Sequence, residues 1–351
     1  MKPLFSIITC SIDPQKYAAF CQNTRTLFAD TAEWILVERP ASLAQGYQTG
    51  LARAKGEYLI FCHDDISLVD PQIPAYLEQD LLALDLVGVA GTSRLVDGHW
   101  ISAGFPYLHG QILHVKPEGY LYTQFGCGAD PPLVTGIQAL DGVFFACRRA
   151  LAESIPFDSQ HFDGFHLYDL DFSFSAFIAG YQLGVDQRLG LIHQSGGRYD
   201  QNWRKYRLRF ERIHRNRLAP GVPALNYWKN KTYNGLDEAE ATLCRASQTK
   251  RVRFKKHEVR LARGAETWQK TDVHALAKEP CDFVIAEPST TISLLLQVAA
   301  ADAVFLIHGN FDPQSYWQLN AHQWTDCQPV AAVPNHLLIQ RRSMDAKPTF
   351  P

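Results

Sequence analysis

Short apolar runs alternate with amphipathic segments along the N-terminal part of the chain. The runs at residues 4–9, 34–37 and 58–62 have the length and composition of strands buried on both faces. Residues 13–28 and 41–55 lie between these runs and have the spacing or composition of helices. This β-α-β-α-β order predicts an α/β fold built on a parallel, doubly wound sheet.

The patterning is less regular beyond residue 70. No GxGxxG follows the first apolar run, so a dinucleotide-binding interpretation loses its main support. Residues 92–136 are rich in glycine, proline and aromatic residues, and we expect long loops or short antiparallel strands that carry function. Further helices are expected at residues 74–84, 172–180 and 203–217, and further strands at 86–90, 137–147 and 189–192.

The last third of the chain repeats patterns of the first. A break rich in proline and glycine predicts two domains, 1–220 and 221–351. Residues 303–310 resemble residues 58–65, but they end in Gly309 and Asn310 instead of two carboxylates. We interpret the second domain as a shortened, degenerate α/β copy that binds no metal and has a parallel sheet within residues 280–342. Chance similarity between α/β strands is the alternative.

Composition and charge narrow the class of protein. The chain has 351 residues, of which 46% are hydrophobic, and a formal net charge of -2. It can bury a large core, and its charge gives no reason to expect nucleic acid or an anionic membrane as a partner. The eight cysteines include no CxxC pair and no zinc spacing, which favours free thiols in a reducing cytosol. No run resembles a signal peptide or a transmembrane segment, so we expect a cytoplasmic protein.

Two adjacent carboxylates, Asp64 and Asp65, end the apolar run at residues 58–62. Ligands gather at the carboxyl ends of strands in open α/β sheets. Two like charges there repel each other unless a cation or hydrogen-bond donors hold them, so Asp64 and Asp65 are candidate ligands of Mg²⁺ or Mn²⁺. The alternative is that one of them caps a helix.

A second acidic cluster and a histidine supply further candidate chemistry. Asp169 and Asp171 precede the helix expected at residues 172–180, where either could act as a general base. The alternative is a helix cap and a favourable interaction with the helix dipole. His193 ends the strand expected at residues 189–192. A lone histidine there is more often structural, but it would complete a metal site begun by Asp65.

Six sequence features, in the order given below, resemble family 2 GT-A glycosyltransferases, in particular the bacterial glycosyltransferase-like subgroup. The resemblance covers roughly residues 3–215. It implies a GT-A (Rossmann-like) mixed, mainly parallel sheet flanked by helices, followed here by a smaller C-terminal α/β domain. The motifs are the first strand, Glu38, and the segments at residues 56–65, 140–149, 165–171 and 192–196.

The resemblance implies roles at the nucleotide end of the site. His63, Asp64 and Asp65 match the DxD position of the family, where the last carboxylate binds a divalent cation, Mn²⁺ or Mg²⁺, and its neighbour approaches the ribose. Glu38 matches the acidic residue that contacts the base. Thr9 stands where the first strand meets the nucleotide. His63 replaces an acidic residue of the family pattern, which leaves the ribose contact open.

The resemblance also implies roles at the reaction end. Asp169 is the first choice for the catalytic base and Asp171 the second, because Tyr168 replaces the glutamate of the family's Glu-Asp pair. His193 matches a late histidine that joins the metal. Asp141 and Gly142 fall where the donor sugar and the acceptor meet.

These residue types fit a metal-dependent, inverting hexosyltransferase. A cation would neutralise the diphosphate leaving group, and one carboxylate would accept the proton of the attacking hydroxyl. We expect a UDP-, GDP- or dTDP-sugar as donor and a glycan or lipid-linked acceptor, in surface or secreted glycan synthesis. The expected location is the cytoplasm or the inner face of the membrane.

Two alternatives remain open. One is a catalytically inactive relative that binds nucleotide or sugar and serves in assembly. The other is a nucleotidyltransferase, which the absence of a glycine-rich, basic loop after the first strand disfavours. In the basic segment at residues 203–210 we expect Trp203, Tyr206 and Phe210 to pack inward, although Arg204 or Lys205 could reach a diphosphate.

Overall fold

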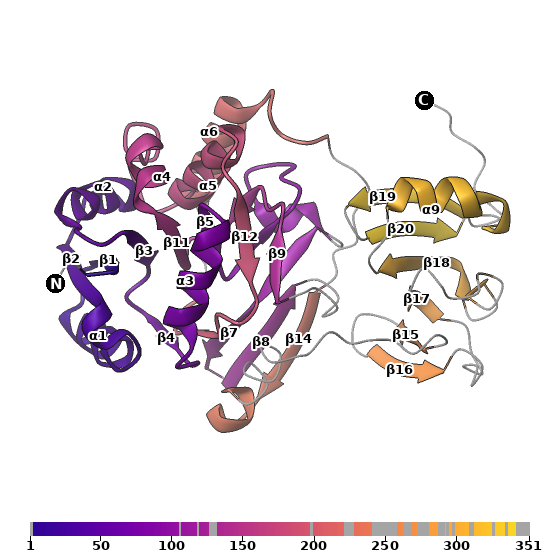
Figure 1. The fold of residues 1–351 in the computed structure, drawn as a ribbon, viewed down its shortest axis with the longest axis horizontal. Coiled ribbons are helices and arrows are strands. Elements are labelled where there is room, and N and C mark those ends of the chain that lie inside the picture. The colour runs from indigo at the N-terminus through magenta and orange to yellow at the C-terminus, as the bar shows by residue number, and fades with distance from the viewer. Residues whose placement is uncertain are drawn as a thin grey trace. The chain divides into compact units, whose positions relative to one another are not determined.

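The chain divides into two compact units, Met1–Lys250 and Arg251–Pro351 (Figure 1). Each unit is described separately below. No helix among the described residues is long and apolar enough to cross a bilayer. The computed structural model describes residues 3–104, 107–117, 119–125, 132–196, 199–220 and 228–240 of the first unit and residues 258–262, 268–272, 281–286, 292, 295–296, 299–308, 312–324, 327–333 and 336–341 of the second.

The first unit is built on a seven-stranded sheet of order β2-β1-β3-β11-β5-β12-β9. The strands β2, β1 and β3 are parallel, whereas β11 runs antiparallel to both of its neighbours, so the sheet is mixed and the predicted α/β class is confirmed. The strands are β1 (Phe5–Ser11), β2 (Ala32–Glu38), β3 (Tyr58–Cys62), β5 (Leu86–Gly88), β9 (Leu133–Thr135), β11 (Phe144–Arg148) and β12 (Leu183–Asp186). The short strand β12 is not predicted from the sequence.

Helices α1 (Pro14–Phe28) and α2 (Leu43–Arg53) connect the parallel strands where the sequence predicts them. Asp13 caps α1, since its carboxylate accepts hydrogen bonds from the backbone nitrogens of the first turn. Two glycines let α2 lie close to the sheet: a Cβ on Gly50 would fall 2.2 Å from Ile8, and one on Gly46 would fall 2.4 Å from Cys10. Further helices of this unit include α3 (Ile73–Ala83), α4 (Arg149–Ser154), α5 (Tyr168–Ile178) and α6 (Gln201–His214), with 3₁₀ turns η1 (Ala29–Thr31) and η2 (Trp100–Ala103).

A cluster of phenylalanine rings joins α5 to the sheet. Phe157 stacks on Phe172 of α5 with ring centroids 4.2 Å apart, and both rings approach Phe61 of β3 and Phe145 of β11. All four side chains are buried. This packing holds the N-terminus of α5 near the carboxyl end of β3.

Helix α5 begins earlier than the sequence predicts. It starts at Tyr168 instead of residue 172, so Asp169 and Asp171 belong to its first turn and do not precede it. Leu167, just before the helix, has φ 62°, a left-handed conformation that costs energy for a residue with a Cβ. Leu167 is therefore the point at which the chain turns into the helix.

A second sheet of the first unit has the order β10-β6-β7-β13-β4. It takes in part of the segment 92–136, which forms antiparallel strands as expected. The strand predicted at residues 137–147 is divided at Asp141 and Gly142 between this sheet and the first one. The strands are β4 (Ile66–Leu68), β6 (Ala90–Thr92), β7 (Leu108–Lys116), β8 (Gly119–Phe125), β10 (Ala139–Leu140) and β13 (Leu191–His193), with β8 pairing with β7.

The first unit extends to Lys250, past the break rich in proline and glycine after residue 220. The strand β14 (Trp228–Tyr233) pairs antiparallel with β8 along its whole length. Tyr233 is buried there in a cluster with Leu113 and Tyr122. Edge pairing with β8 therefore keeps this segment in the first unit.

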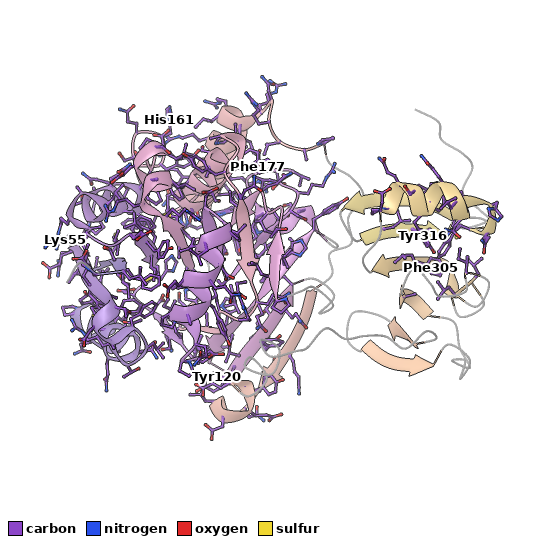
Figure 2. All side chains as sticks on the ribbon, viewed as in Figure 1. Lys55, Tyr120, His161, Phe177, Phe305 and Tyr316 are labelled. Atoms are coloured by element: carbon purple, nitrogen blue, oxygen red, sulfur yellow. The ribbon has the colours of Figure 1, made fainter. Side chains whose placement is uncertain are left out.

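The second unit is a six-stranded sheet of order β16-β15-β17-β18-β20-β19. Only β17 and β18 are parallel among its paired strands in the described residues. Phe305 and Tyr316 belong to the core between the sheet and helix α9 (Figure 2). The elements are β15 (Glu258–Ala262), β16 (Trp268–Asp272), β17 (Cys281–Ala286), β18 (Ala299–His308), α9 (Pro313–Asn320), η3 (Ala321–Gln323), β19 (Cys327–Val333) and β20 (His336–Arg341).

Four strands of the second unit share an arrangement with four strands of the first. The row β17-β18-β20-β19 is paired parallel, antiparallel and antiparallel, as is the row β1-β3-β11-β5. The strands occur in the same order along the chain, and a helix, α9 or α3, lies between the second and third of them. This correspondence supports the hypothesis of a degenerate copy. Gly309 and Asn310 lie outside the described residues.

Candidate functional site

The pairing of β4 with β13 brings Asp65 and His193 together. Asp65 stands between β3 and β4, and its carbonyl oxygen accepts a hydrogen bond from the backbone nitrogen of Gln194. In the antiparallel register, His193 is the partner of Ile66, the residue after Asp65. This backbone geometry fixes the two side chains near one another at the carboxyl end of β3.

His63, Asp65 and His193 form a candidate metal site. One potential ligand atom from each lies within 4.8 Å of the other two. Oδ1 of Asp65 is 3.3 Å from Nε2 of His193 and 3.8 Å from Nδ1 of His63. This oxygen is buried and receives no hydrogen bond from the described residues, an unfavourable state that a cation would relieve. Two imidazole nitrogens and a carboxylate oxygen therefore fit a divalent cation.

The protonation states suit metal binding. Burial lowers the pKa of the His63 imidazole, and the neighbouring His193 lowers it further. Burial would raise the pKa of Asp65, but the attraction of His193 and His63 outweighs it and holds the pKa below the ordinary range. These shifts favour an ionised Asp65 and a neutral His63, the forms in which a carboxylate and an imidazole bind cations.

His114 is a further histidine beside this group, and the sequence analysis does not identify it. It lies on β7 opposite His193 in the parallel pairing of β7 with β13, with ring centroids 5.6 Å apart. Burial and the nearby His193 lower its pKa. Its sequence signal is weak, because β7 contains other polar residues such as His109 and Gln111.

Asp169 is held at the N-terminus of α5 by the loop between β10 and β11. Its Oδ2 accepts a hydrogen bond of 2.7 Å from the backbone nitrogen of Gly142. Burial, and then the charge of Asp141, raise the pKa of Asp169 to about 7. A carboxyl with this pKa can accept a proton near neutral pH.

Asp141 and Gly142 fix the geometry of that loop. The two carboxylate oxygens of Asp141 accept hydrogen bonds from the Trp100 indole nitrogen, 3.1 Å away, and from the Val143 backbone nitrogen, 3.0 Å away. Gly142 leaves no room for a side chain, because a Cβ would lie 2.6 Å from Cβ of Asp169 and from the hydroxyl of Tyr168. The loop thus requires glycine at this position.

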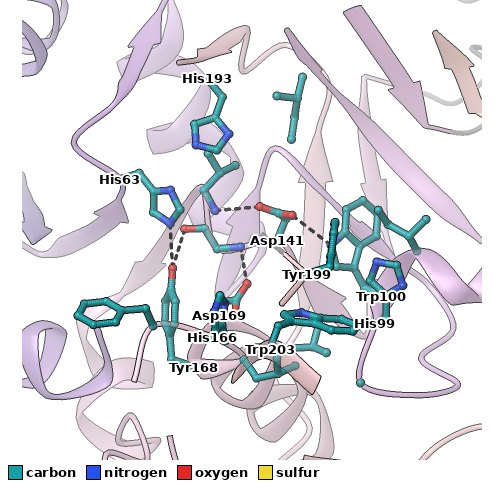
Figure 3. Close-up of a pocket in the computed structure, with 18 of the residues that line it drawn as sticks. His63, His99, Trp100, Asp141, His166, Tyr168, Asp169, His193, Tyr199 and Trp203 are labelled. Carbon is teal, nitrogen blue, oxygen red and sulfur yellow. Dashed lines mark hydrogen bonds between the residues drawn. The ribbon is translucent and has the colours of Figure 1, made fainter. Parts of the chain in front are cut away.

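The candidate base and two members of the candidate metal site, His63 and His193, line one cavity of about 210 Å³, whereas Asp65 is not among its lining residues (Figure 3). His63 and His193 line one side of it, and Asp141 and Asp169 lie towards its centre. Aromatic side chains, among them His99, Trp100, Tyr199 and Trp203, line the other side. The cavity therefore combines a candidate metal site, a candidate base and a largely aromatic wall.

A second cavity of about 230 Å³ lies at the ends of β1 and β2. Ser11, Tyr17 and Glu38 are among the residues that line it. Asp64 is linked to this cavity, since its Oδ2 accepts a hydrogen bond of 2.5 Å from the hydroxyl of Ser11. The two neighbouring aspartates thus contact different partners: Asp65 contacts the histidines and Asp64 contacts the end of β1.

The model of the glycosyltransferase-like family matches residues 6–214, more than half of the chain. The chain belongs to this family. The match spans both cavities and every candidate site residue named above. It ends at His214, the last residue of α6.

The chain is also similar to several individual proteins. The chain is 28% identical over 233 residues, 62% of its length and 86% of the other protein, to the ATP synthase subunits region ORF 6 product of Fuscovulum blasticum. It is similar to mannosyltransferase PcManGT of Pyrobaculum calidifontis in complex with GDP-Man and Mn²⁺, with 14% identity, a TM-score of 0.41 and coverage of 63% of this chain and 66% of that one. It is also similar to GalNAc-T7 with UDP, GalNAc and Mn²⁺, with 12% identity, a TM-score of 0.37 and coverage of 60% and 48%.

In this glycosyltransferase-like chain, Asp171 does not reach the cavity. It is buried, and its Oδ1 lies 2.7 Å from Nε2 of His214 on α6. Thr9 is also buried, with its hydroxyl 3.5 Å from the thiol of Cys62, and it lines neither cavity. Ser11, two residues further along β1, lines the second cavity and donates a hydrogen bond to Asp64.

Only some side chains of the basic helix α6 pack in the interior of the protein. Tyr206 and Phe210 are buried as predicted, but Trp203 lines the first cavity instead of packing in the core. Arg204 and Lys205 are exposed and line neither cavity. Arg207 of the same helix forms ion pairs with Asp97 and Glu211.

Proposed function

We propose that the chain is a metal-dependent, inverting glycosyltransferase that moves a hexose from a nucleotide-diphosphate sugar to a hydroxyl group. One observation carries the proposal: a candidate base, Asp169, and two members of a candidate metal site, His63 and His193, line the same cavity. Transfer from such a donor needs both groups, one for the leaving diphosphate and one for the attacking hydroxyl.

The metal would be held by His63, Asp65 and His193. Bound there, it supplies Lewis-acid stabilisation of the diphosphate charge. Mg²⁺ prefers oxygen ligands and keeps several waters, whereas imidazole suits later transition metals and is accepted by Mn²⁺. Two imidazoles in three protein ligands therefore favour Mn²⁺ over Mg²⁺.

Asp169 is the base in this proposal, and Asp141 positions the substrate. Both oxygens of Asp141 already accept hydrogen bonds from N–H donors, which stabilise its charge and reduce its nucleophilicity. Asp169, whose pKa is raised, accepts the proton of the acceptor hydroxyl when it is ionised. With one base and no carboxylate nucleophile, the hydroxyl displaces the leaving group directly and the anomeric configuration inverts.

The second cavity is the proposed nucleoside site. Glu38 lines it and can accept hydrogen bonds from the N–H groups of a base. The Ser11–Asp64 pair lies between this cavity and the metal site, which suits a ribose followed by a diphosphate. GDP-, UDP- and dTDP-sugars are the donors to test, with a glycan or lipid-linked acceptor in surface or secreted glycan synthesis.

The cytoplasm, including the inner membrane face, is the proposed location. Cys10, Cys21, Cys62 and Cys147 are free thiols in the structure. Burial raises the pKa of Cys62 to about 12, so its thiol stays protonated and unreactive. Buried free thiols are typical of proteins in reducing compartments.

Donor hydrolysis and transfer test the function. The wild-type protein should hydrolyse or transfer from at least one of the UDP-, GDP- and dTDP-hexoses in the presence of Mn²⁺, and a chelator should abolish this. Asp65→Ala should remove the activity, whereas His161→Asn, on an exposed side chain outside both cavities, should retain it. Turnover that survives in Asp65→Ala would contradict the metal mechanism. Donor binding without turnover would instead favour an inactive nucleotide-sugar-binding protein.

A further inference from the structure

We propose that His99, Tyr199 and Trp203 form an acceptor subsite for a pyranose ring, so that the acceptor is a saccharide. This inference rests on the proposed function, because it assumes that Asp169 accepts the proton of an acceptor hydroxyl. The three residues are called the aromatic subsite below.

The rings of the aromatic subsite support one another. Tyr199 and Trp203 meet edge to face with centroids 5.0 Å apart and planes at 89°. His99 meets Tyr199 at 5.2 Å and Trp203 at 5.3 Å, also edge to face. Such contacts are favourable for aromatic pairs and orient each ring face in a defined direction. The subsite is therefore an ordered surface and not a set of independent side chains.

Contacts within helix α6 support Trp203 of the aromatic subsite. Trp203 lies in the first turn of α6, where its backbone nitrogen donates a hydrogen bond to the Asp200 carboxylate. The guanidinium of Arg207 lies 5.6 Å from the Trp203 ring centroid and forms ion pairs with Asp97 and Glu211. These contacts hold the indole in place before any ligand arrives.

The aromatic subsite is also accessible. The side chain of Tyr199 is 56% exposed although it lines the cavity. An exposed tyrosine beside a tryptophan at a cavity rim is an amphipathic surface that suits a ligand with both apolar and polar groups.

The position of the subsite matches that of an acceptor. Figure 3 shows His99, Tyr199 and Trp203 on one side of Asp141 and Asp169, with His63 and His193 on the other. If the donor diphosphate is held at the histidines, the sugar to be transferred lies over Asp141 and Asp169. A molecule whose hydroxyl points at Asp169 from the opposite side then extends across the aromatic subsite.

The chemistry of the lining favours a saccharide over a phosphate-bearing acceptor. A pyranose presents a face of C–H groups that packs on an aromatic ring and a rim of hydroxyls that needs hydrogen-bond partners. Asp141 and His166 supply polar groups beside the rings. Among the described residues that line the cavity there is no lysine or arginine to pair with a phosphate.

Saturation-transfer NMR with simple glycosides tests the subsite without relying on turnover. The probes are the methyl α- and β-glycosides of glucose, galactose, mannose and N-acetylglucosamine. At least one should receive saturation on the protons of one ring face from the wild-type protein. The signal should fall strongly in Trp203→Ala and persist in Leu208→Ala, a change on an exposed position of the same helix.

Kinetics provide the second measurement. With the glycoside that binds, Trp203→Ala should raise the acceptor KM by about tenfold, as expected for loss of one aromatic contact, while donor hydrolysis changes by less than about twofold. Absence of saturation transfer to every glycoside, or equal transfer to wild type and Trp203→Ala, would overturn the subsite. Binding of an isoprenyl phosphate that depends on Trp203, without binding of any glycoside, would also overturn the subsite.

The two proposals fail separately in these experiments. If no donor is bound or hydrolysed, the proposed function fails even where glycosides bind at Trp203. If donors are hydrolysed but the acceptor KM is the same in wild type and Trp203→Ala, the subsite fails and the proposed function stands.

Discussion

Nε2 of His63 lies 3.1 Å from the hydroxyl oxygen of Tyr168, so the two residues at which the chain departs from the acidic pattern implied by the family resemblance contact one another. The Tyr168 hydroxyl donates a hydrogen bond to the carbonyl of Gly142. Its oxygen is then an acceptor for Nε2–H of a neutral His63 imidazole. This assigns the lone pair to Nδ1, which is the nitrogen that faces Asp65. The contact between His63 and Tyr168 therefore leaves Nδ1 of His63 free to act as a ligand in the proposed metal site.

Removing the Tyr168 hydroxyl should weaken metal binding. In Tyr168→Phe the His63 imidazole loses the partner that fixes its tautomer and orientation. Loss of such a supporting contact typically costs about 10–100-fold in metal affinity. We expect a drop of this size in the affinity for Mn²⁺ measured by titration calorimetry. Tyr181→Phe, whose hydroxyl contacts Ser154 instead, is the matched control. Equal Mn²⁺ affinity in Tyr168→Phe and wild type would contradict the assignment.

His63 should also control the choice of metal. Because it supplies a nitrogen ligand, wild type should be stabilised against heat more by Mn²⁺ than by Mg²⁺ at equal concentration. His63→Asp replaces that nitrogen with a carboxylate oxygen, which Mg²⁺ prefers. The difference between the two metals should therefore shrink in the variant when melting temperatures are compared. A difference as large as that of wild type would mean that His63 is not a ligand.

The strand that carries the carboxylates is predictable because its signal is local. The run at residues 58–62 is uniformly apolar and ends abruptly at charge, and the structure has β3 there. The position of His193 next to Asp65 depends instead on the pairing of β4 with β13. These strands are far apart in the sequence, and no local pattern predicts their register. The short strand β14 shows the same limit, since its sequence is mostly polar and edge pairing with β8 makes it a strand.

The choice between Asp169 and Asp171 illustrates a different limit. Residues two apart on a helix point about 200° apart, so only one of the pair can face a given cavity. Once the helix start is known, the sequence shows that Asp169 and Asp171 face in different directions. It does not show which face of the helix lines the cavity. In the structure Asp169 faces Gly142 and Asp171 faces His214. Trp203 likewise shares a helix face with Tyr206 and Phe210, but lies where that face leaves the core and reaches the cavity.

The pH profile of transfer should follow the ionisation of Asp169. Its pKa is raised to about 7 by burial and by the charge of Asp141. Since a base must be deprotonated, kcat/KM should rise by about tenfold per pH unit below pH 7 and become level above it. Asp169→Asn should lower kcat by about 10²–10⁴-fold. Asp171→Asn should keep the profile of wild type, and a loss of activity there as large as in Asp169→Asn would contradict the assignment.

The same carboxyl should make stability depend on pH. Its folded pKa of about 7 lies above the unfolded value of about 3.9, so the folded state binds the proton more tightly. The resulting stabilisation is complete below pH 4 and is lost as the pH rises to 7. We compare the change in the free energy of unfolding that Asp169→Asn causes at two pH values. This change should be more stabilising at pH 8 than at pH 4, by about 2–4 kcal/mol. Denaturant titrations of the metal-free protein at both pH values measure this, and an equal effect at both would contradict it.

Truncation tests the boundary between the two units. Every residue proposed for the site lies before Lys250, so a chain of residues 1–250 should fold and keep the Mn²⁺ affinity of the full chain. A chain of residues 1–220 lacks β14, which leaves the edge of β8 unpaired and removes Tyr233 from its cluster with Leu113 and Tyr122. Loss of those hydrogen bonds and that burial should lower its melting temperature by roughly 5 °C or more relative to residues 1–250. If both truncated chains melt at the same temperature, β14 contributes nothing to the first unit and the boundary belongs at residue 220, where the break rich in proline and glycine predicts it.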